Sequence, residues 1–149
     1  MGRCGGGDSD GSGTKTTLSA LIDTNVLVTH LTGDPPDMAA RATLFLSSSS
    51  PGELVLVDFV VAEIVYVLES FYEAPRAQVA DAARSIIGFE AITVVDEETL
   101  LRAIEIYEVE RLDFAEAYLV AAAESAEVDH IVSFDKSIDR MGTVRRVEP

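Results

Sequence analysis

Leu18-Ser19-Ala20-Leu21-Ile22-Asp23-Thr24-Asn25 is the stretch that decides the fold, because an apolar run ends there on an acid. The run His130-Ile131-Val132-Ser133-Phe134-Asp135 ends in the same way near the C-terminus. Short apolar runs of this kind indicate buried parallel strands, and open α/β sheets bind ligands at the carboxyl ends of such strands. Each run therefore brings a carboxylate to the ligand-binding edge of the sheet, which suggests a divalent-metal site.

The rest of the chain alternates apolar runs with segments of helical periodicity. We expect strands at residues 18–22, 54–57, 92–95, 130–134 and 143–147, and helices at 25–31, 37–47, 59–71, 75–87, 97–108 and 113–126. Alternation of this kind is typical of α/β proteins. The predicted fold is a three-layer α/β/α sandwich with a central parallel sheet of four to five strands and helices on both faces.

The domain organisation follows from length and composition. A chain of 149 residues with 48% hydrophobic residues can bury one core. Residues 1–15 are rich in glycine, serine and aspartate, so we expect a disordered tail there and one domain at 16–149. Within 7–16, a stretch like a phosphate loop lacks the glycine directly before the lysine. The one cysteine, Cys4, allows neither a disulfide framework nor a cysteine-rich zinc site.

The net charge of −15 argues against a nucleic-acid interface that relies on a broadly basic surface. Clustered acids can instead hold cations. The N-terminus has no apolar core of a secretory signal, and no run reaches the roughly 18 apolar residues of a membrane helix. We therefore expect a cytoplasmic protein without membrane association.

Two acids lie inside segments that are expected to form apolar helices. Glu63 is the only charged residue between Phe59 and Leu68, and Glu116 follows Asp113 in a segment rich in alanine. A buried carboxylate is costly unless it is paired or bound to a metal, so metal coordination would explain both acids. Two alternatives stay open: Glu63 can lie on a narrow solvated stripe, and Asp113 with Glu116 fits a helix-capping box.

These segments, in this order, resemble PIN-domain ribonucleases, and most closely the VapC-type toxins of bacterial and archaeal toxin–antitoxin pairs. The resemblance covers about residues 18–147. It rests on Leu-Ile-Asp-Thr-Asn, Val-Ala-Glu-Ile-Val-Tyr-Val-Leu-Glu, Leu-Asp-Phe-Ala-Glu-Ala and Ile-Val-Ser-Phe-Asp-Lys-Ser-Ile-Asp. Each segment alone is a weak signal, whereas the ordered set is more specific.

The resemblance implies a site for Mg²⁺, or Mn²⁺ in its place, built from four acids. Carried over by position, these are Asp23, Glu63, Glu116 and Asp135. Close relatives have aspartate where this chain has Glu116, so Asp113 is a second candidate ligand at that place. The residues expected around the ligands are Thr24, Asn25, Ser133 and Asp139.

The activity that the resemblance implies is metal-dependent cleavage of RNA phosphodiester bonds by an endoribonuclease acting as a toxin. The implied partners are an RNA substrate, a cognate VapB-like antitoxin that inserts an arginine into the acidic cleft, and a second copy in a homodimer. Arg145 and Arg146 are candidate RNA contacts, with solvated edge charges as the alternative.

Two other functions compete with this interpretation. The glutamate at position 116 is compatible with a catalytically weakened PIN-domain protein that only binds its partner. Asp135 and Asp139 also match the last motif of haloacid-dehalogenase-type phosphatases. Those enzymes need a second aspartate where Asn25 stands, and Lys136 is in the wrong place for their lysine.

Overall fold

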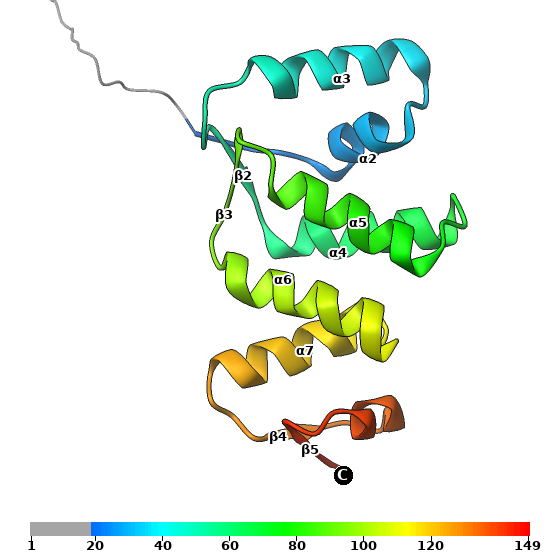
Figure 1. Ribbon diagram of the computed structural model, residues 1–149, viewed down its shortest axis with the longest axis vertical. Coiled ribbons are helices and arrows are strands. Elements are labelled where there is room, and N and C mark those ends of the chain that lie inside the picture. Colours follow the sequence, from blue (N-terminus) through cyan, green and yellow to red (C-terminus); the bar gives the residue numbers. More distant parts are fainter. Residues whose placement is uncertain (1–18) are drawn as a thin grey trace, which may run out of the picture.

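The computed structural model describes residues 19–149, and its elements follow one another along one long axis (Figure 1). The elements are β1 (Ala20–Leu21), α2 (Thr24–Thr32), α3 (Pro36–Ser48), β2 (Leu54–Leu56), α4 (Asp58–Ser70), α5 (Arg76–Ile87), β3 (Ile92–Val94), α6 (Glu97–Glu105), η3 (Ile106–Glu110), α7 (Phe114–Ser125), β4 (His130–Val132), η4 (Lys136–Arg140) and β5 (Arg145–Val147). The expected tail at 1–15, Cys4, the stretch at 7–16 and Leu18 lie outside the described residues.

The α/β class and the parallel strands are confirmed. In the first sheet the order is β1-β2-β3, with Ala20 opposite Leu54 and Leu54 opposite Ile92. In the second, β4 pairs with β5 in parallel, with His130 opposite Arg145. Helices between successive strands make the crossovers that parallel pairing requires. Among residues 19–149, none of the helices combines the length and apolarity that crossing a bilayer requires.

The five expected strands form two sheets, which corrects the prediction of one central sheet. Helices α6 and α7 pack against each other and extend the molecule beyond α4 and α5, so β4 and β5 lie at the opposite end from α3 (Figure 1). Because β1 and β4 each have only two or three residues, hydrogen bonds between strands do little to hold them together. The position of the strands is therefore set by helix packing.

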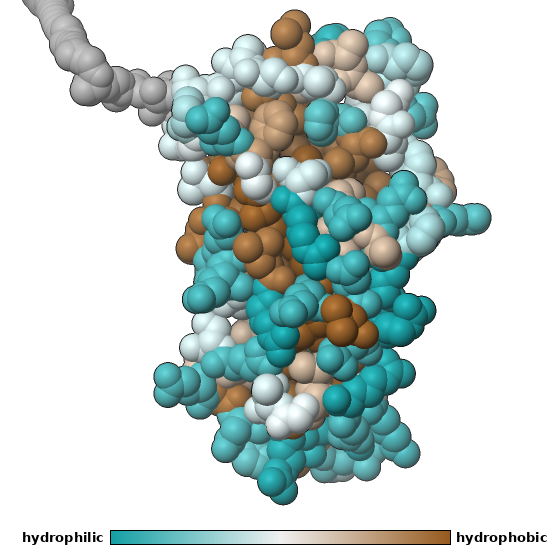
Figure 2. Space-filling model, in the orientation of Figure 1, coloured by the Kyte–Doolittle hydropathy of each residue, from teal (hydrophilic) through white to brown (hydrophobic). Residues whose placement is uncertain are grey.

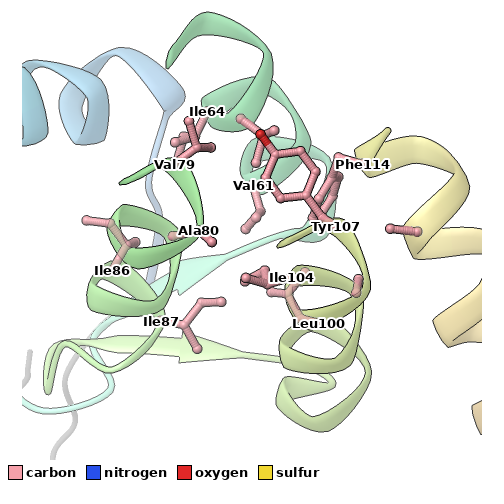
Figure 3. Packing of buried hydrophobic residues seen from close by; sticks show 14 of the residues in the cluster. Val61, Ile64, Val79, Ala80, Ile86, Ile87, Leu100, Ile104, Tyr107 and Phe114 are labelled. Atoms are coloured by element: carbon pink, nitrogen blue, oxygen red, sulfur yellow. The ribbon is translucent and has the colours of Figure 1, made fainter. Parts of the chain in front are cut away.

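The hydrophobic core lies where α4, α5, α6 and η3 meet (Figure 3). Helix α4 buries Val60, Val61, Ile64, Val65 and Leu68, a spacing that places them on one side of a helix. Full burial of such a side chain stabilises the fold by about 1.5–3 kcal/mol. The core therefore anchors the middle of the molecule, from which both sheets extend.

The two faces of the first sheet are covered unequally. Ile22, Leu54 and Ile92 are buried, whereas Leu21 on the other face is 74% exposed and Thr93 is exposed as well. The face that carries Leu21 and Thr93 is therefore less covered than the other, because α6 and α7 continue away from it. Helix α7 accordingly leaves Leu119 48% exposed.

The helix expected at 97–108 changes character at its end. Helix α6 stops at Glu105 and continues as the wider π-helical turn η3, after which Arg111 adopts a left-handed φ of 62°. Arg76 stabilises this turn, because its Nη1 donates to the carbonyl oxygens of Tyr107 and Leu112, each at 2.7 Å. Its guanidinium also lies 4.3 Å from the centre of the Tyr107 ring. The turn redirects the chain into α7.

Candidate functional site

Two of the four candidate acids share one pocket. Asp23 follows β1 as the N-cap of α2, and Glu63 projects from α4. The Thr24 hydroxyl donates to Glu63 Oε1 at 2.6 Å, which ties the start of α2 to α4. The pocket has a volume of about 590 Å³, and its lining includes Asp23, Thr24, Asn25, Glu63 and Tyr66. The first acid pair is therefore assembled at the carboxyl end of β1.

The Asp23 carboxylate is available to a ligand. It is exposed and makes no capping hydrogen bond to the helix that it precedes. The N-terminus of α2 still favours a negative charge there, because unpaired N–H groups give it a partial positive charge. Among residues 19–149, both oxygens of Asp23 are therefore free to coordinate a cation.

Glu63 is exposed, so the expectation that its helix buries it is wrong. It shares one side of α4 with Phe59, which is 71% exposed, and Tyr66, which is 68% exposed. The solvated stripe considered as an alternative describes its surroundings, because Phe59, Glu63 and Tyr66 are all exposed on that side. Tyr66 lines the pocket but was not among the residues predicted from the sequence; its signal is the spacing of three residues from Glu63, which places both on one helical face.

Asp135 lies at the carboxyl end of β4 and begins η4. Its Oδ1 accepts the Ser137 N–H at 2.9 Å, and its own N–H donates to the Ser133 hydroxyl at 2.9 Å. The hydrogen bonds from Ser137 lower the pKa of Asp135, and the positive charges of Arg140 and Arg146 lower it further. Asp135 is thus held as an anion, with one oxygen already engaged.

Glu116 lies near Asp135, in the first turn of α7. Burial raises the pKa of Glu116, and the negative charges of Asp135 and Asp113 raise it further. Asp113 is the N-cap of α7, as the capping alternative requires, yet its side chain makes no capping hydrogen bond. The capping box is therefore not formed, and three acids remain in one neighbourhood of like charge.

The structure separates the four acids into two pairs. Within residues 19–149, no group of three or more histidine, cysteine, aspartate or glutamate side chains is placed to hold a metal ion. The expectation that Asp23, Glu63, Glu116 and Asp135 meet in one pocket is not met within a single chain. The reason is the distance between β1 and β4 along the long axis, with α4, α6 and α7 between them (Figure 1).

The remaining candidate residues differ in their exposure and in their hydrogen bonds. Asn25 lines the first pocket and is exposed. Asp139 accepts two hydrogen bonds from Arg146, at 3.0 and 3.1 Å, and Arg146 also donates to the Ser133 carbonyl oxygen at 2.9 Å. Arg146 is accordingly only 10% exposed, so it stabilises β4 and η4 rather than facing solvent. Arg145 is exposed.

Comparison with known proteins assigns a family to this arrangement. A family model described as PIN domain matches residues 20–144. The chain is also 26% identical over 123 residues to a protein named VapC ribonuclease from Aquifex aeolicus (strain VF5), an alignment that covers 82% of this chain and 91% of that protein. The matched segment contains both acid pairs, and the family resemblance inferred from the sequence motifs is confirmed.

Proposed function

Because this chain belongs to the PIN-domain family, we propose that it is a metal-dependent endoribonuclease that acts as the toxin of a toxin–antitoxin pair. The observation that carries the proposal is the pocket in which Asp23 and Glu63 lie together at the carboxyl end of β1. The similarity to a protein named VapC ribonuclease supports RNA as the substrate. We place the protein in the cytoplasm, where such a substrate is found.

The donor set suits Mg²⁺, with Mn²⁺ as an alternative. Carboxylate oxygens are the ligands that these hard cations prefer, and Mg²⁺ commonly takes one or two carboxylates together with water and phosphate oxygens. Asp23 fits this requirement because its oxygens are free of capping bonds. The family resemblance assigns Asp23 and Asp135 as ligands, with Glu116 or Asp113 as a third, but one chain holds these acids in two separate pairs, of which the Asp23 pair lines the pocket. When bound, the ion would neutralise phosphate charge and activate a water molecule.

Side chains that line the pocket orient the water molecule that attacks the RNA. The Thr24 hydroxyl fixes Glu63 Oε1, which leaves Oε2 to accept a hydrogen bond from a water molecule in the pocket. The Asn25 amide lines the same pocket and can orient either that water or the neighbouring carboxylate. Glu63 thereby acts as the proton acceptor, provided that the water lies within about 2.6–3.2 Å of its oxygen.

The acidic surroundings also suit the proposed antitoxin. Arginine pairs with carboxylates in a planar, two-bonded geometry, so an arginine-bearing VapB-like segment would bind Asp23 and Glu63 in place of the cation. RNA is negatively charged, so binding it requires positively charged side chains near the site. Of the two arginines considered for that role, Arg145 is exposed while Arg146 is engaged by Asp139, so we assign the contact to Arg145.

The test is an RNA-cleavage assay with purified protein, structured RNAs and either Mg²⁺, Mn²⁺ or EDTA. We expect cleavage with a divalent ion, none with EDTA, and a loss of at least roughly 100-fold for Asp23→Asn, because a ligand charge is removed. Asp81→Asn, an acid that is 78% exposed on α5, should cleave like wild type. Cleavage that survives in EDTA or in Asp23→Asn would contradict the proposal.

A second candidate function is binding without catalysis. It is favoured by the separation of the acids into two pairs and by Glu116 at a position where the family resemblance implies aspartate. In that case the assay would show no cleavage with any ion, while the protein would still bind an arginine-bearing peptide through Asp23. A chromogenic phosphate monoester tested in parallel would detect the phosphatase alternative.

A further inference from the structure

Tyr66 differs from the other tyrosines of the chain, all four of which lie within residues 19–149. The other three donate their hydroxyl groups to carboxylates: Tyr72 to Asp34, Tyr107 to Glu69 and Tyr118 to Asp58. They also lie against other aromatic rings. Tyr66 has neither kind of partner among residues 19–149, and it is 68% exposed. Both its ring and its hydroxyl are therefore available to a ligand.

Tyr66 lies next to the first pair of candidate acids. It follows Glu63 by three residues on α4, which places both residues on one side of the helix. Both line the pocket of about 590 Å³ that Asp23 also lines. Val28 and Val67 add apolar surface to the same pocket. The pocket thus combines two carboxylates with an apolar surface on which a flat ring can lie.

A groove that adjoins this pocket carries a positive charge. It has a volume of about 570 Å³ and shares Asp23 and Asn25 with the pocket. Arg41 of α3 lines the groove, is exposed, and forms no ion pair with another of residues 19–149. It is the only positively charged residue that lines either cavity in the described part of the chain. Asp23 therefore lies where the two cavities meet, with Tyr66 lining one and Arg41 the other.

The charge of the molecule favours a nucleobase as the partner of the Tyr66 ring. The chain carries a net charge of −15, which repels the phosphates of RNA. Proteins that bind single-stranded nucleic acids combine positive side chains along the backbone with aromatic rings on which bases stack. Because positive side chains are scarce around Asp23, stacking has to contribute a large share of the binding. A base is favoured over a protein surface because the same pocket holds the acids proposed to act on the adjoining phosphate.

We propose that Tyr66 and Arg41 hold the RNA strand on the two sides of Asp23. A base stacks on the Tyr66 ring in the pocket, and a phosphate of the same strand pairs with the Arg41 guanidinium in the groove. Neither residue takes part in the reaction; both bind the substrate and set which phosphate lies over Asp23. A base in a duplex is stacked on its neighbours, so only an unpaired nucleotide can present its face to Tyr66. This inference rests on the function proposed above.

The role of the ring is tested by binding rather than cleavage. The probe is a short fluorescein-labelled single-stranded RNA of mixed sequence, with Ca²⁺, which also binds carboxylate oxygens, in place of Mg²⁺. Gel electrophoresis shows that the RNA stays intact, and fluorescence anisotropy gives the Kd. Tyr66→Ala should weaken binding roughly 5- to 150-fold, whereas Tyr66→Phe keeps the ring and should bind like wild type. The matched control is Phe71→Ala, because Phe71 is 81% exposed at the end of the same helix and lines neither cavity.

Two further binding measurements separate stacking from charge. A duplex RNA of the same length should bind wild type more weakly than the single strand does, and Tyr66→Ala should remove this preference. Each phosphate contact contributes about 0.7 to the slope of log Kd against log salt concentration for a single strand. Arg41→Gln should lower that slope by about 0.7, whereas Tyr66→Ala should leave it unchanged. Arg111→Gln is the control, because Arg111 is exposed and lines neither cavity.

Several results would overturn the proposal. A wild-type protein that does not bind the single strand, or a Tyr66→Ala variant that binds it equally well, would show that no base stacks on the ring. Equal losses for Tyr66→Ala and Tyr66→Phe would assign the effect to the hydroxyl. An unchanged salt slope for Arg41→Gln would exclude the phosphate contact. A Tyr66→Ala variant with unchanged RNA affinity but a different mass in light scattering would show that a protein surface covers the ring.

Folding and activity are checked separately. Tyr66 and Arg41 are exposed, so circular dichroism should show that their variants fold like wild type. Cleavage with Mg²⁺ together with unchanged binding in both variants would contradict this inference alone. Binding differences as expected, but no cleavage with any divalent ion, would contradict the proposed function and leave the two binding residues in place.

Discussion

The N-terminal and C-terminal regions of this molecule carry the same sequence signature, an apolar strand that ends on an acid, in different chemical settings. Asp23 is exposed and makes no capping bond. Asp135 accepts a hydrogen bond from Ser137 and is attracted by Arg140 and Arg146. The signature therefore places a carboxylate at a strand end in both regions, but only the surroundings decide whether that carboxylate is free for a ligand.

The two regions also differ in the hydropathy of their surfaces and in their ion pairs. On the face shown in Figure 2, hydrophobic residues gather over the half that contains α2 and α3, whereas the half with α7, β4 and β5 is mostly hydrophilic. The C-terminal half adds ion pairs to its buried apolar residues, such as Arg102 with Glu124 at 2.8 Å and Arg146 with Asp139 at 3.0 Å. Its stability should consequently depend more on pH and salt.

The largest expected effects come from substituting the two strand-end acids, Asp23 and Asp135. Asp23→Asn and Asp135→Asn should each reduce RNA cleavage by at least roughly 100-fold, because each removes the charge of a proposed metal ligand. Their effects on the metal-free protein should differ. Asparagine is an equally good N-cap, so Asp23→Asn should keep or raise the melting temperature, whereas Asp135→Asn loses its attraction to two arginines and should lower it.

Cleavage rates and thermal melts in EDTA check this prediction, with Asp81→Asn as the control for loss of an exposed acid. Equal melting temperatures for the two variants would mean that the two acids differ in the geometry of their surroundings but not in how much they stabilise the fold. A large drop for Asp23→Asn would show that its carboxylate has a structural partner.

The next effect concerns Arg76, which lies at the junction between the N-terminal and C-terminal regions. Arg76→Met leaves the carbonyl oxygens of Tyr107 and Leu112 without their donor and removes the stacking on the Tyr107 ring. We expect the free energy of unfolding to fall by about 2–3 kcal/mol. Urea titration measures this. Arg84→Met in the same helix breaks the pairs with Asp81 and Glu108 and should cost under about 1 kcal/mol, so similar losses for both variants would contradict the special role of Arg76.

Local structure was predictable because it follows from local patterns. The strand expected at 54–57 is Leu54–Leu56, and the helix expected at 59–71 is Asp58–Ser70. Apolar periodicity identifies such elements because burial and hydrogen bonding act over a few residues. The positions of Asp23 and Asp135 at strand ends were predictable on the same ground.

The assembly of the site was not predictable in the same way. Periodicity shows which side of α7 is apolar, but not that this side packs beside α6 rather than across the first sheet. The exposure of Glu63 depends on what covers α4, and the engagement of Arg146 depends on where η4 places Asp139. These are long-range contacts, which a single sequence does not encode in any short pattern.

A smaller effect tests the ionic character of the C-terminal region. The hydrogen bond from Arg102 lowers the pKa of Glu124 below its ordinary value of 4.5, and Thr143 adds to this. A lowered folded-state pKa means that the stabilisation is complete above pH 4.5 and is lost as pH falls through the folded-state pKa. Glu124→Gln should therefore be about 1 kcal/mol less stable at pH 7, and the difference from wild type should be smaller at pH 3. Denaturant titrations at both pH values check this, and a difference of the same size in acid would mean that packing, not charge, is lost.

The smallest effect uses Glu116, which lies two turns before Glu124 on the same helix and has the opposite shift. Its pKa is raised by burial and by Asp135 and Asp113, so the folded state binds a proton more readily than the unfolded chain. Stability then falls as pH rises from the ordinary pKa of 4.5 through the folded-state pKa of Glu116, and the penalty is complete above it. Glu116→Gln should raise the metal-free melting temperature at pH 7 but not below pH 4.5, whereas Glu116→Asp keeps the charge and should not. If Glu116→Gln lowers the melting temperature at pH 7, a cation within the fold already compensates this carboxylate. Glu116 would then be, like other acids of the C-terminal region, already engaged by a positively charged group.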